Sequence, residues 1–269
     1  PDDADLAVIA IGVRSGEGAD RQTMALPAED VQLIRDAARQ CRQKGAKSVV
    51  VLNVCAPVEM AEWVEEVDAV LLAWLAGMEI GHDVADVLSG EVCPSGKLPL
   101  TIPRRYKDTP TFLNFPGEFG EVVYGEGIFV GYRYYDTAEV APLYAFGHGL
   151  SYTRFEMSDL ALSAEELDLD AGGSLTVSVD VTNAGPCAGK EVVQLYVQDV
   201  DSAVRKPAKE LKGFAKVLLD PGQTTTARFE ITPEALRHYD AREQQWRVQP
   251  SVFRVMVGSS SRDIRTTAE

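Results

Sequence analysis

Residues 6–12 read LAVIAIG, a continuous apolar run that ends in glycine. Such a run is typical of a β-strand that is buried on both faces. A segment with strong helix signals follows at 27–44, where Pro27 suits the first turn and Gly45 suits the position just after the last turn. The apolar residues of this predicted helix recur on one face, at Val31, Ile34, Ala38 and Cys41. The two segments together predict a strand with a helix packed against it.

The same strand–helix unit then repeats. An apolar run at 48–54, SVVVLNV, precedes a predicted helix near 58–66, and a run at 69–74, AVLLAW, precedes a predicted helix near 79–89. Alternating apolar strands and amphipathic helices favour a parallel sheet that helices cover on both faces. Three strands are few for such a sheet, which usually has about 5–6. We therefore expect the rest of this α/β domain to lie upstream of the chain.

The second half of the sequence has a different pattern. Residues 94–150 are rich in proline, glycine and aromatic residues, which is typical of an irregular segment that wraps over other parts of a protein. Beyond it the apolar period becomes two, which predicts short strands at 174–182, 191–198, 225–231 and 252–258. We expect an α/β plus all-β fold: a partial parallel-sheet α/β sandwich with the wrapping segment at 1–156, and a β-sandwich of immunoglobulin or fibronectin type III kind at 157–269.

Composition limits the choice of partners. The 269 residues carry a formal net charge of −15, and such a surface repels phosphate backbones and anionic lipid headgroups. We therefore expect neither a nucleic acid nor a membrane as partner, whereas a neutral sugar is compatible.

The cysteines Cys41, Cys55, Cys93 and Cys187 form no CxxC pair, so buried free thiols are favoured over a disulfide or a metal site. We expect no cofactor and no metal in the mechanism.

The glycine-rich stretch after the first strand is the candidate site. It runs from Gly12 to Arg21 as GVRSGEGADR. Its spacing does not match GxGxxG, no GK[ST] follows, and the carboxylate of Glu17 between two glycines would repel a phosphate. The alternative is that Glu17 is presented on a loop beyond the carboxyl end of a parallel strand, where ligands of such sheets bind. The alternative that Glu17 is a solvated loop residue stays open at this point. We interpret Asp20 and Arg21 as a local ion pair.

Several motifs in a fixed order resemble one enzyme family. The stretch SGEGADR at 15–21 is similar to the acid/base loop of family 3 glycoside hydrolases, although Ala19 stands where many relatives have tyrosine. It is followed by SVVVLNVCAPVE at 48–59, DVLSGEVCPSGKLP at 86–99, FLNFPGEFGEVVYGEGIFVGYRYY at 112–135, AFGHGLSYTRF at 145–155 and KPAKELKGFAKV at 206–217. The chain thus resembles the C-terminal portion of a β-glucosidase of this family, that is, the second half of the α/β sandwich and a fibronectin type III-like domain.

The resemblance implies a function and a missing partner. Glu17 would be the catalytic acid/base of a retaining β-glucosidase, and the nucleophile would be an aspartate of an N-terminal (β/α)8 barrel outside this chain. This chain alone is then expected to be inactive. The alternatives are a β-xylosidase or α-L-arabinofuranosidase of the same family, or a non-catalytic carbohydrate-binding or structural module. The resemblance assigns no substrate-binding residue here, and the fibronectin-like domain is expected to stabilise the assembly, with a homodimer as one possible arrangement.

Overall fold

The computed structural model describes residues 4–16, 18, 21–168 and 172–269. The chain forms two compact units that interleave along the sequence. Unit 1 comprises Pro1–Val92, Ile102–Val123 and Ala141–Tyr144, and unit 2 comprises Cys93–Thr101, Tyr124–Val140 and Ala145–Glu269. The domain boundary at 156/157 stays a prediction. None of the helices in the described part of the chain has the length and apolar character needed to span a bilayer.

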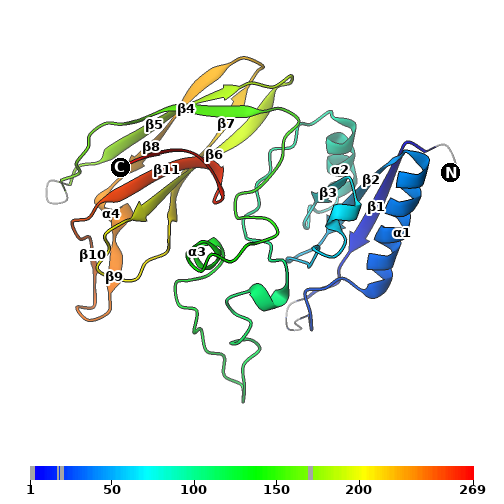
Figure 1. The fold of residues 1–269 in the computed structure, drawn as a ribbon, viewed down its shortest axis with the longest axis horizontal. Coiled ribbons are helices and arrows are strands. Elements are labelled where there is room, and N and C mark those ends of the chain that lie inside the picture. The colour runs from blue at the N-terminus through cyan, green and yellow to red at the C-terminus, as the bar shows by residue number, and fades with distance from the viewer. Residues whose placement is uncertain (1–3, 17, 19–20, 169–171) are drawn as a thin grey trace. The chain divides into compact units, whose positions relative to one another are not determined.

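Unit 1 contains, within the described residues, a parallel sheet of three strands in the order β1-β2-β3 (Figure 1). The strands are β1 (Leu6–Gly12), β2 (Lys47–Asn53) and β3 (Ala69–Leu72). The helices are α1 (Ala28–Lys44), which packs against β1 and β2, and α2 (Ile80–Ser89). Two short 3-10 turns complete the unit, η1 (Val64–Glu66) and η2 (Tyr106–Asp108). The parallel α/β arrangement predicted from the repeated apolar runs is confirmed.

Helix α1 follows its sequence signals closely. Its buried residues are Val31, Ile34, Ala38 and Cys41, the same four that the periodicity places on one face. Gly45 ends the helix with φ +72°, and the N–H of Ala46 donates to the Cys41 carbonyl at 2.9 Å. Pro27 lies at the N-cap rather than inside the first turn.

Two predictions for unit 1 are wrong. Strand β2 is buried from Ser48 to Leu52, but β1 is an edge strand whose Leu6 and Val8 are 43% and 50% exposed, so only one of its faces is covered. The predicted helix near 58–66 is reduced to η1, and the N–H of Glu59 just before it donates to the carbonyl of Met24 at 2.9 Å. Whether both faces of a strand such as β1 are buried depends on what packs against each face, and the local sequence pattern does not reveal this.

Unit 2 is a β-sandwich (Figure 1). Within the described residues one sheet has the order β12-β11-β6-β7 and the other β4-β5-β8. The strands are β4 (Phe155–Leu162), β5 (Leu175–Asn183), β6 (Gly189–Asp199), β7 (Glu210–Leu219), β8 (Thr224–Ile231), β11 (Phe253–Ser260) and β12 (Asp263–Ala268). Helix α4 (Pro233–Leu236) leads into a small hairpin of β9 (His238–Asp240) and β10 (Gln245–Arg247). The predicted antiparallel sandwich is confirmed.

The core of unit 2 shows the expected period of two. On β5, Val177, Val179 and Val181 are all completely buried. They pack with side chains of the facing sheet, among them Val193, Leu195 and Val257. At about 25 cal/mol per Å² of apolar surface removed from water, such alternating valines and leucines are the main stabilising contribution of a sandwich.

Part of the predicted wrapping segment belongs to unit 2. Helix α3 (Tyr132–Thr137) lies against the chain just before and within β7. The N–H of Leu211 donates to the Tyr132 hydroxyl at 2.8 Å, and the N–H of Ala208 donates to the Thr137 hydroxyl at 2.9 Å. Lys209 forms an ion pair of 2.8 Å with Asp136, which is almost completely buried. The ring of Tyr132 stacks on that of Phe146, whereas Tyr124 is 81% exposed.

Candidate active site

The carboxyl ends of the three parallel strands define one edge of the unit 1 sheet. Beyond β1 the N–H of Val13 donates to the Asn53 carbonyl at 3.3 Å, and beyond β3 the N–H of Ala73 donates to the Leu52 carbonyl at 2.9 Å. The loops after all three strands therefore start side by side. Ligands of open parallel sheets bind at this edge, because loops from neighbouring strands converge there.

The predicted catalytic residue, Glu17, lies outside the described residues, as do Ala19 and Asp20. The neighbours Ser15, Gly16 and Gly18 are described and are exposed, and Gly18 has φ +79°, which glycine adopts without steric cost. Arg21 donates from Nη2 to the carbonyl of Ala25 at 2.9 Å. This bond ties the end of the glycine-rich loop to the chain just before α1.

Asn53 and Trp74 connect the ends of β2 and β3. The side-chain amide of Asn53 donates to the main-chain carbonyl of Trp74. Trp74 has φ +52°, a left-handed conformation that is unfavourable for a bulky residue and is found where the surroundings enforce it. The bond holds this strained turn at the carboxyl edge of the sheet. Asn53 is not among the candidates from the sequence, although a polar residue near the end of the apolar run SVVVLNV was the available signal.

The loop after β3 carries exposed apolar side chains. Leu75 is 68% exposed and Met78 is 98% exposed, and Gly77 turns the chain between them with φ +81°. Helix α2, which follows, contains no buried residue although its apolar residues recur on one face. Large apolar side chains that are exposed together are typical of a surface that another domain or a ligand covers.

Several other acidic residues have structural roles. Glu62 and Glu66 both form ion pairs with Arg35, at 3.7 and 3.0 Å. The side chain of Glu59 accepts a hydrogen bond from the N–H of Tyr106. Glu118 and Glu121 bond to each other through their main chains, in a turn. Within the described residues, no group of three or more His, Cys, Asp and Glu side chains is placed to hold a metal ion.

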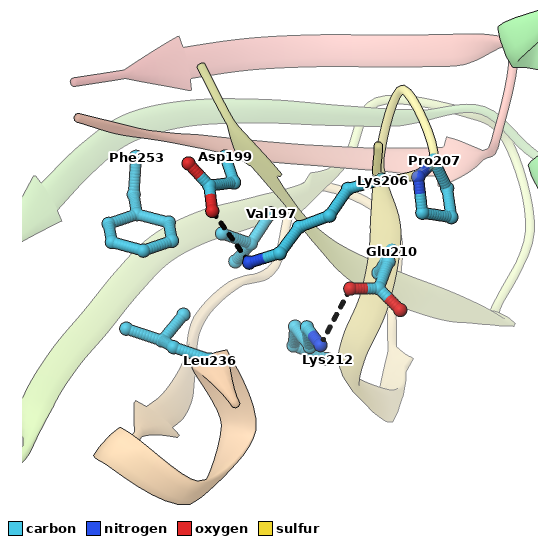
Figure 2. A pocket seen from close by; sticks show the side chains of 8 residues that line it. All are labelled: Val197, Asp199, Lys206, Pro207, Glu210, Lys212, Leu236 and Phe253. Carbon is cyan, nitrogen blue, oxygen red and sulfur yellow. Dashed lines mark hydrogen bonds and ion pairs between the residues drawn. The ribbon is translucent and has the colours of Figure 1, made fainter. Parts of the chain in front are cut away.

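A pocket of unit 2 has charged walls (Figure 2). Lys206 lies 2.6 Å from Asp199, and both side chains are largely buried; Lys212 lies 3.2 Å from Glu210. The Ser251 hydroxyl donates a further hydrogen bond to Asp199. Apolar side chains complete the wall, among them Leu236 and Phe253. Because each of these charges is paired, the arrangement holds the chain before β7 on the sandwich and offers no free acid or base.

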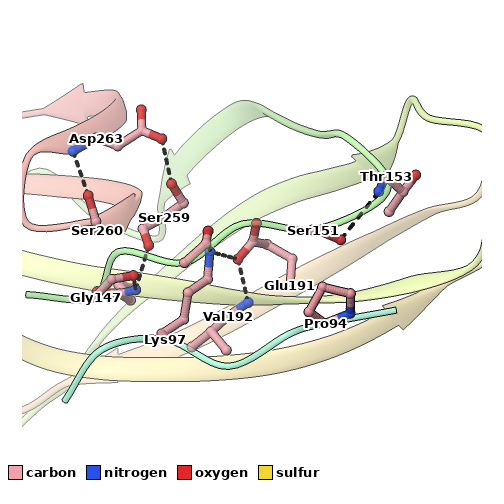
Figure 3. A network of polar contacts seen from close by, with 12 residues as sticks. Pro94, Lys97, Gly147, Ser151, Thr153, Glu191, Val192, Ser259, Ser260 and Asp263 are labelled. Atoms are coloured by element: carbon pink, nitrogen blue, oxygen red, sulfur yellow. Dashed lines mark hydrogen bonds and ion pairs between the residues drawn. The ribbon is translucent and has the colours of Figure 1, made fainter. Parts of the chain in front are cut away.

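A second buried ion pair anchors residues 93–101 within unit 2 (Figure 3). Lys97 Nζ lies 2.8 Å from Glu191 Oε1, and Lys97 also donates to the Gly149 carbonyl at 3.2 Å. Gln194 donates to the carbonyls of Gly147 and Ser259, at 3.3 and 2.6 Å. Residues of the predicted motifs at 86–99 and 145–155 thus meet on strand β6. Lys97, Gly147 and Gly149 therefore contribute to the stability of unit 2.

The fold defines a class of protein: a partial α/β sandwich with a parallel sheet, followed by a fibronectin type III-like sandwich. Residues 1–152 match the Glycosyl hydrolase family 3 C-terminal domain, and residues 191–261 match the Fibronectin type III-like domain. The chain therefore belongs to glycosyl hydrolase family 3.

Relatives and solved structures agree with this assignment. The chain is 47% identical over 264 residues to the thermostable beta-glucosidase B of Acetivibrio thermocellus, a match that covers 97% of this chain and 34% of that protein. It superposes with a TM-score of 0.92 and 44% identity on beta-glucosidase 3B from Thermotoga neapolitana in complex with alpha-D-glucose, covering 98% of this chain and 37% of that one. The Bifidobacterium adolescentis GH3 beta-glucosidase gives a TM-score of 0.92 at 38% identity, covering 99% and 39%. The chain spans about a third of the length of these relatives.

Proposed function

We propose that this chain is the C-terminal part of a retaining β-glucosidase that hydrolyses terminal β-D-glucosyl residues from oligosaccharides or glucosides. The observation that carries the proposal is the 47% identity to a protein named as a beta-glucosidase, over 97% of the chain. The similar solved structures include one with bound alpha-D-glucose. The exposed edge of the unit 1 sheet, with its loops from three strands, is a suitable place for a sugar-facing carboxylate.

In this proposal Glu17 is the acid/base. A retaining glycosidase places two carboxyl groups about 5–5.5 Å apart, one as nucleophile and one that protonates the leaving oxygen and then deprotonates water. The nucleophile is an aspartate of an N-terminal (β/α)8 barrel portion, so the active site is completed only when both portions are present. The exposed glycines Gly16 and Gly18 flank Glu17 and permit a close approach to that barrel.

The proposal is tested in the complete enzyme with Glu17→Gln. We expect hydrolysis of cellobiose to fall by about 10²–10⁴-fold, since general acid catalysis contributes a factor of that size. Activated aryl β-glucosides, whose leaving groups need no protonation, should retain more activity, and azide should accelerate their turnover. The matched control is Glu29→Gln, an exposed residue in the first turn of α1. Unchanged turnover of cellobiose by the Glu17 variant would rule out this assignment.

The sugar specificity needs a separate test. A panel of aryl β-glucoside, β-xyloside and α-L-arabinofuranoside should show the highest kcat/KM for the β-glucoside. A preference for the pentosides contradicts the β-glucosidase proposal while leaving the role of Glu17 in place.

The proposed partner and assembly are tested by mass. Intact-mass measurement of every polypeptide in the active preparation should show a barrel-bearing portion, on the same chain or on a second one. We assign the fibronectin-like domain to stabilising this assembly, and light scattering distinguishes a monomer from a homodimer.

A further inference from the structure

Two cysteines that lie far apart in the sequence meet in unit 2. Cys93 begins the segment 93–101, and Cys187 lies in the connection between β5 and β6. The thiols of Cys187 and Cys93 lie within hydrogen-bonding reach of each other. Independently, a Cβ placed on Gly189, two residues beyond Cys187, would lie 3.3 Å from the Cys93 sulfur. Both side chains are half-buried, so small molecules can reach them.

The main chain on both sides is held in place. The carbonyl of Cys187 accepts a hydrogen bond of 2.8 Å from the side-chain amide of Asn183, which is completely buried. The Cys93 sulfur lies 3.2 Å from the hydroxyl of Ser151. The Thr153 hydroxyl in turn donates to Asn183 at 2.6 Å. The two sulfur atoms are therefore presented to each other by ordered residues of a single compact unit.

We propose that Cys93 and Cys187 form a reversible disulfide that attaches the segment 93–101 covalently to the β5–β6 connection of the sandwich. The oxidant is a low-molecular-weight disulfide such as oxidised glutathione. The Cys93 thiolate attacks one sulfur of the oxidant and releases one thiol, and the Cys187 thiolate then attacks the Cys93 sulfur and releases the second. Two protein thiols are oxidised, the small disulfide is reduced by two electrons, and the two protein protons end on the released thiols.

Burial, the neighbouring charge of Cys93 and the hydrogen bond to it together raise the pKa of Cys187. Because the thiolate is the attacking form, the raised pKa slows attack by Cys187 near neutral pH. The bond closes a long loop, and loop closure lowers the conformational entropy of the unfolded chain, so the oxidised form should be the more stable one.

Alkylation and mass spectrometry test the proposal. The purified protein is equilibrated at pH 8 with oxidised or with reduced glutathione, then denatured and treated with iodoacetamide. The reduced sample should take up four alkyl groups, one for each cysteine. In the oxidised sample Cys93 and Cys187 should carry neither an alkyl group nor glutathione, whereas the exposed Cys55 should carry glutathione. A non-reducing peptide map should contain a Cys93–Cys187 cross-link that dithiothreitol removes. Oxidation should also raise the thermal midpoint by about 5–10 °C.

The control is Cys55→Ser, which removes an exposed thiol and should leave the cross-link and the shift unchanged. Cys93→Ser should abolish both. Four alkylated cysteines after oxidation would overturn the proposal, as would stable glutathione adducts on both thiols or a cross-link that involves another cysteine. If Cys93→Ser does not fold, the peptide map of the parent protein decides by itself.

Discussion

The side-chain amide of Asn53 donates a hydrogen bond to the main-chain carbonyl of Trp74, and this bond joins the carboxyl ends of β2 and β3. Trp74 adopts φ +52°, which costs a non-glycine residue roughly 1–3 kcal/mol. The hydrogen bond offsets part of this cost. It also holds the start of the loop that presents Leu75 and Met78 at the proposed sugar-facing edge.

Asn53→Ala removes this hydrogen bond. Because the bond is exposed, we expect the free energy of unfolding to fall by about 0.5–1.5 kcal/mol, measured by urea denaturation. Gln40→Ala, an exposed substitution on α1, is the control and should change it by less than about 0.5 kcal/mol. Equal effects of the two substitutions would show that the amide does not support the Trp74 turn.

Lys97→Met leaves the carboxylate of Glu191 buried without its partner. The two side chains are only 13% and 9% exposed, so the expected loss is about 3–5 kcal/mol in the free energy of unfolding. The double variant Lys97→Met/Glu191→Leu should recover much of this loss, because it removes the unpaired charge. Arg39→Ala breaks the exposed pair with Asp36 and should cost less than about 1 kcal/mol. A small effect of Lys97→Met would mean that Glu191 is accessible to water.

Stability should depend on pH through His148. Burial lowers the pKa of His148 below its usual value near 6.5, the nearby Lys97 lowers it further, and Asp263 acts in the opposite direction. The unfolded chain therefore binds this proton more readily than the folded protein does. The contribution of His148 is fully present above about pH 6.5 and is lost as the pH falls below that value.

Urea denaturation at pH 7.5 and 5.5 measures this dependence. His148→Asn should have a smaller loss of stability between the two pH values than the parent protein. His82→Asn removes an exposed histidine and should keep the parent's dependence. Identical slopes for the parent protein and His148→Asn would contradict the prediction.

Gly149→Ala should disturb the contact between residues 93–101 and the sandwich. A Cβ at Gly149 would lie 2.1 Å from the main-chain carbonyl oxygen of Gly96, which is too close for any side chain. We expect a loss of about 1–3 kcal/mol in the free energy of unfolding. The reciprocal substitution, Gly96→Ala, meets nothing within 4 Å and should be close to neutral. Thermal denaturation of the two variants side by side is the measurement.

The parts that could be predicted are those whose signals are local. Helix α1 shows its buried face at Val31, Ile34, Ala38 and Cys41, and its end at Gly45, because helix periodicity and the left-handed cap act within one segment. The alternation on β5 is local in the same way. Strand β7 was missed, because exposed residues such as Phe214 and Leu218 break the apolar–polar alternation that a sequence search uses.

The sequence by itself determined the parallel α/β segment, the antiparallel sandwich and the glycine-flanked Glu17, since periodicity, turn residues and ordered motifs are properties of neighbouring positions. Only the tertiary structure decided that β1 is covered on one face, that Asn53 supports Trp74, that Lys97 is paired with Glu191, and that Cys93 meets Cys187. Each of these depends on residues brought together from distant positions by packing, and distance in space is not encoded in any local pattern.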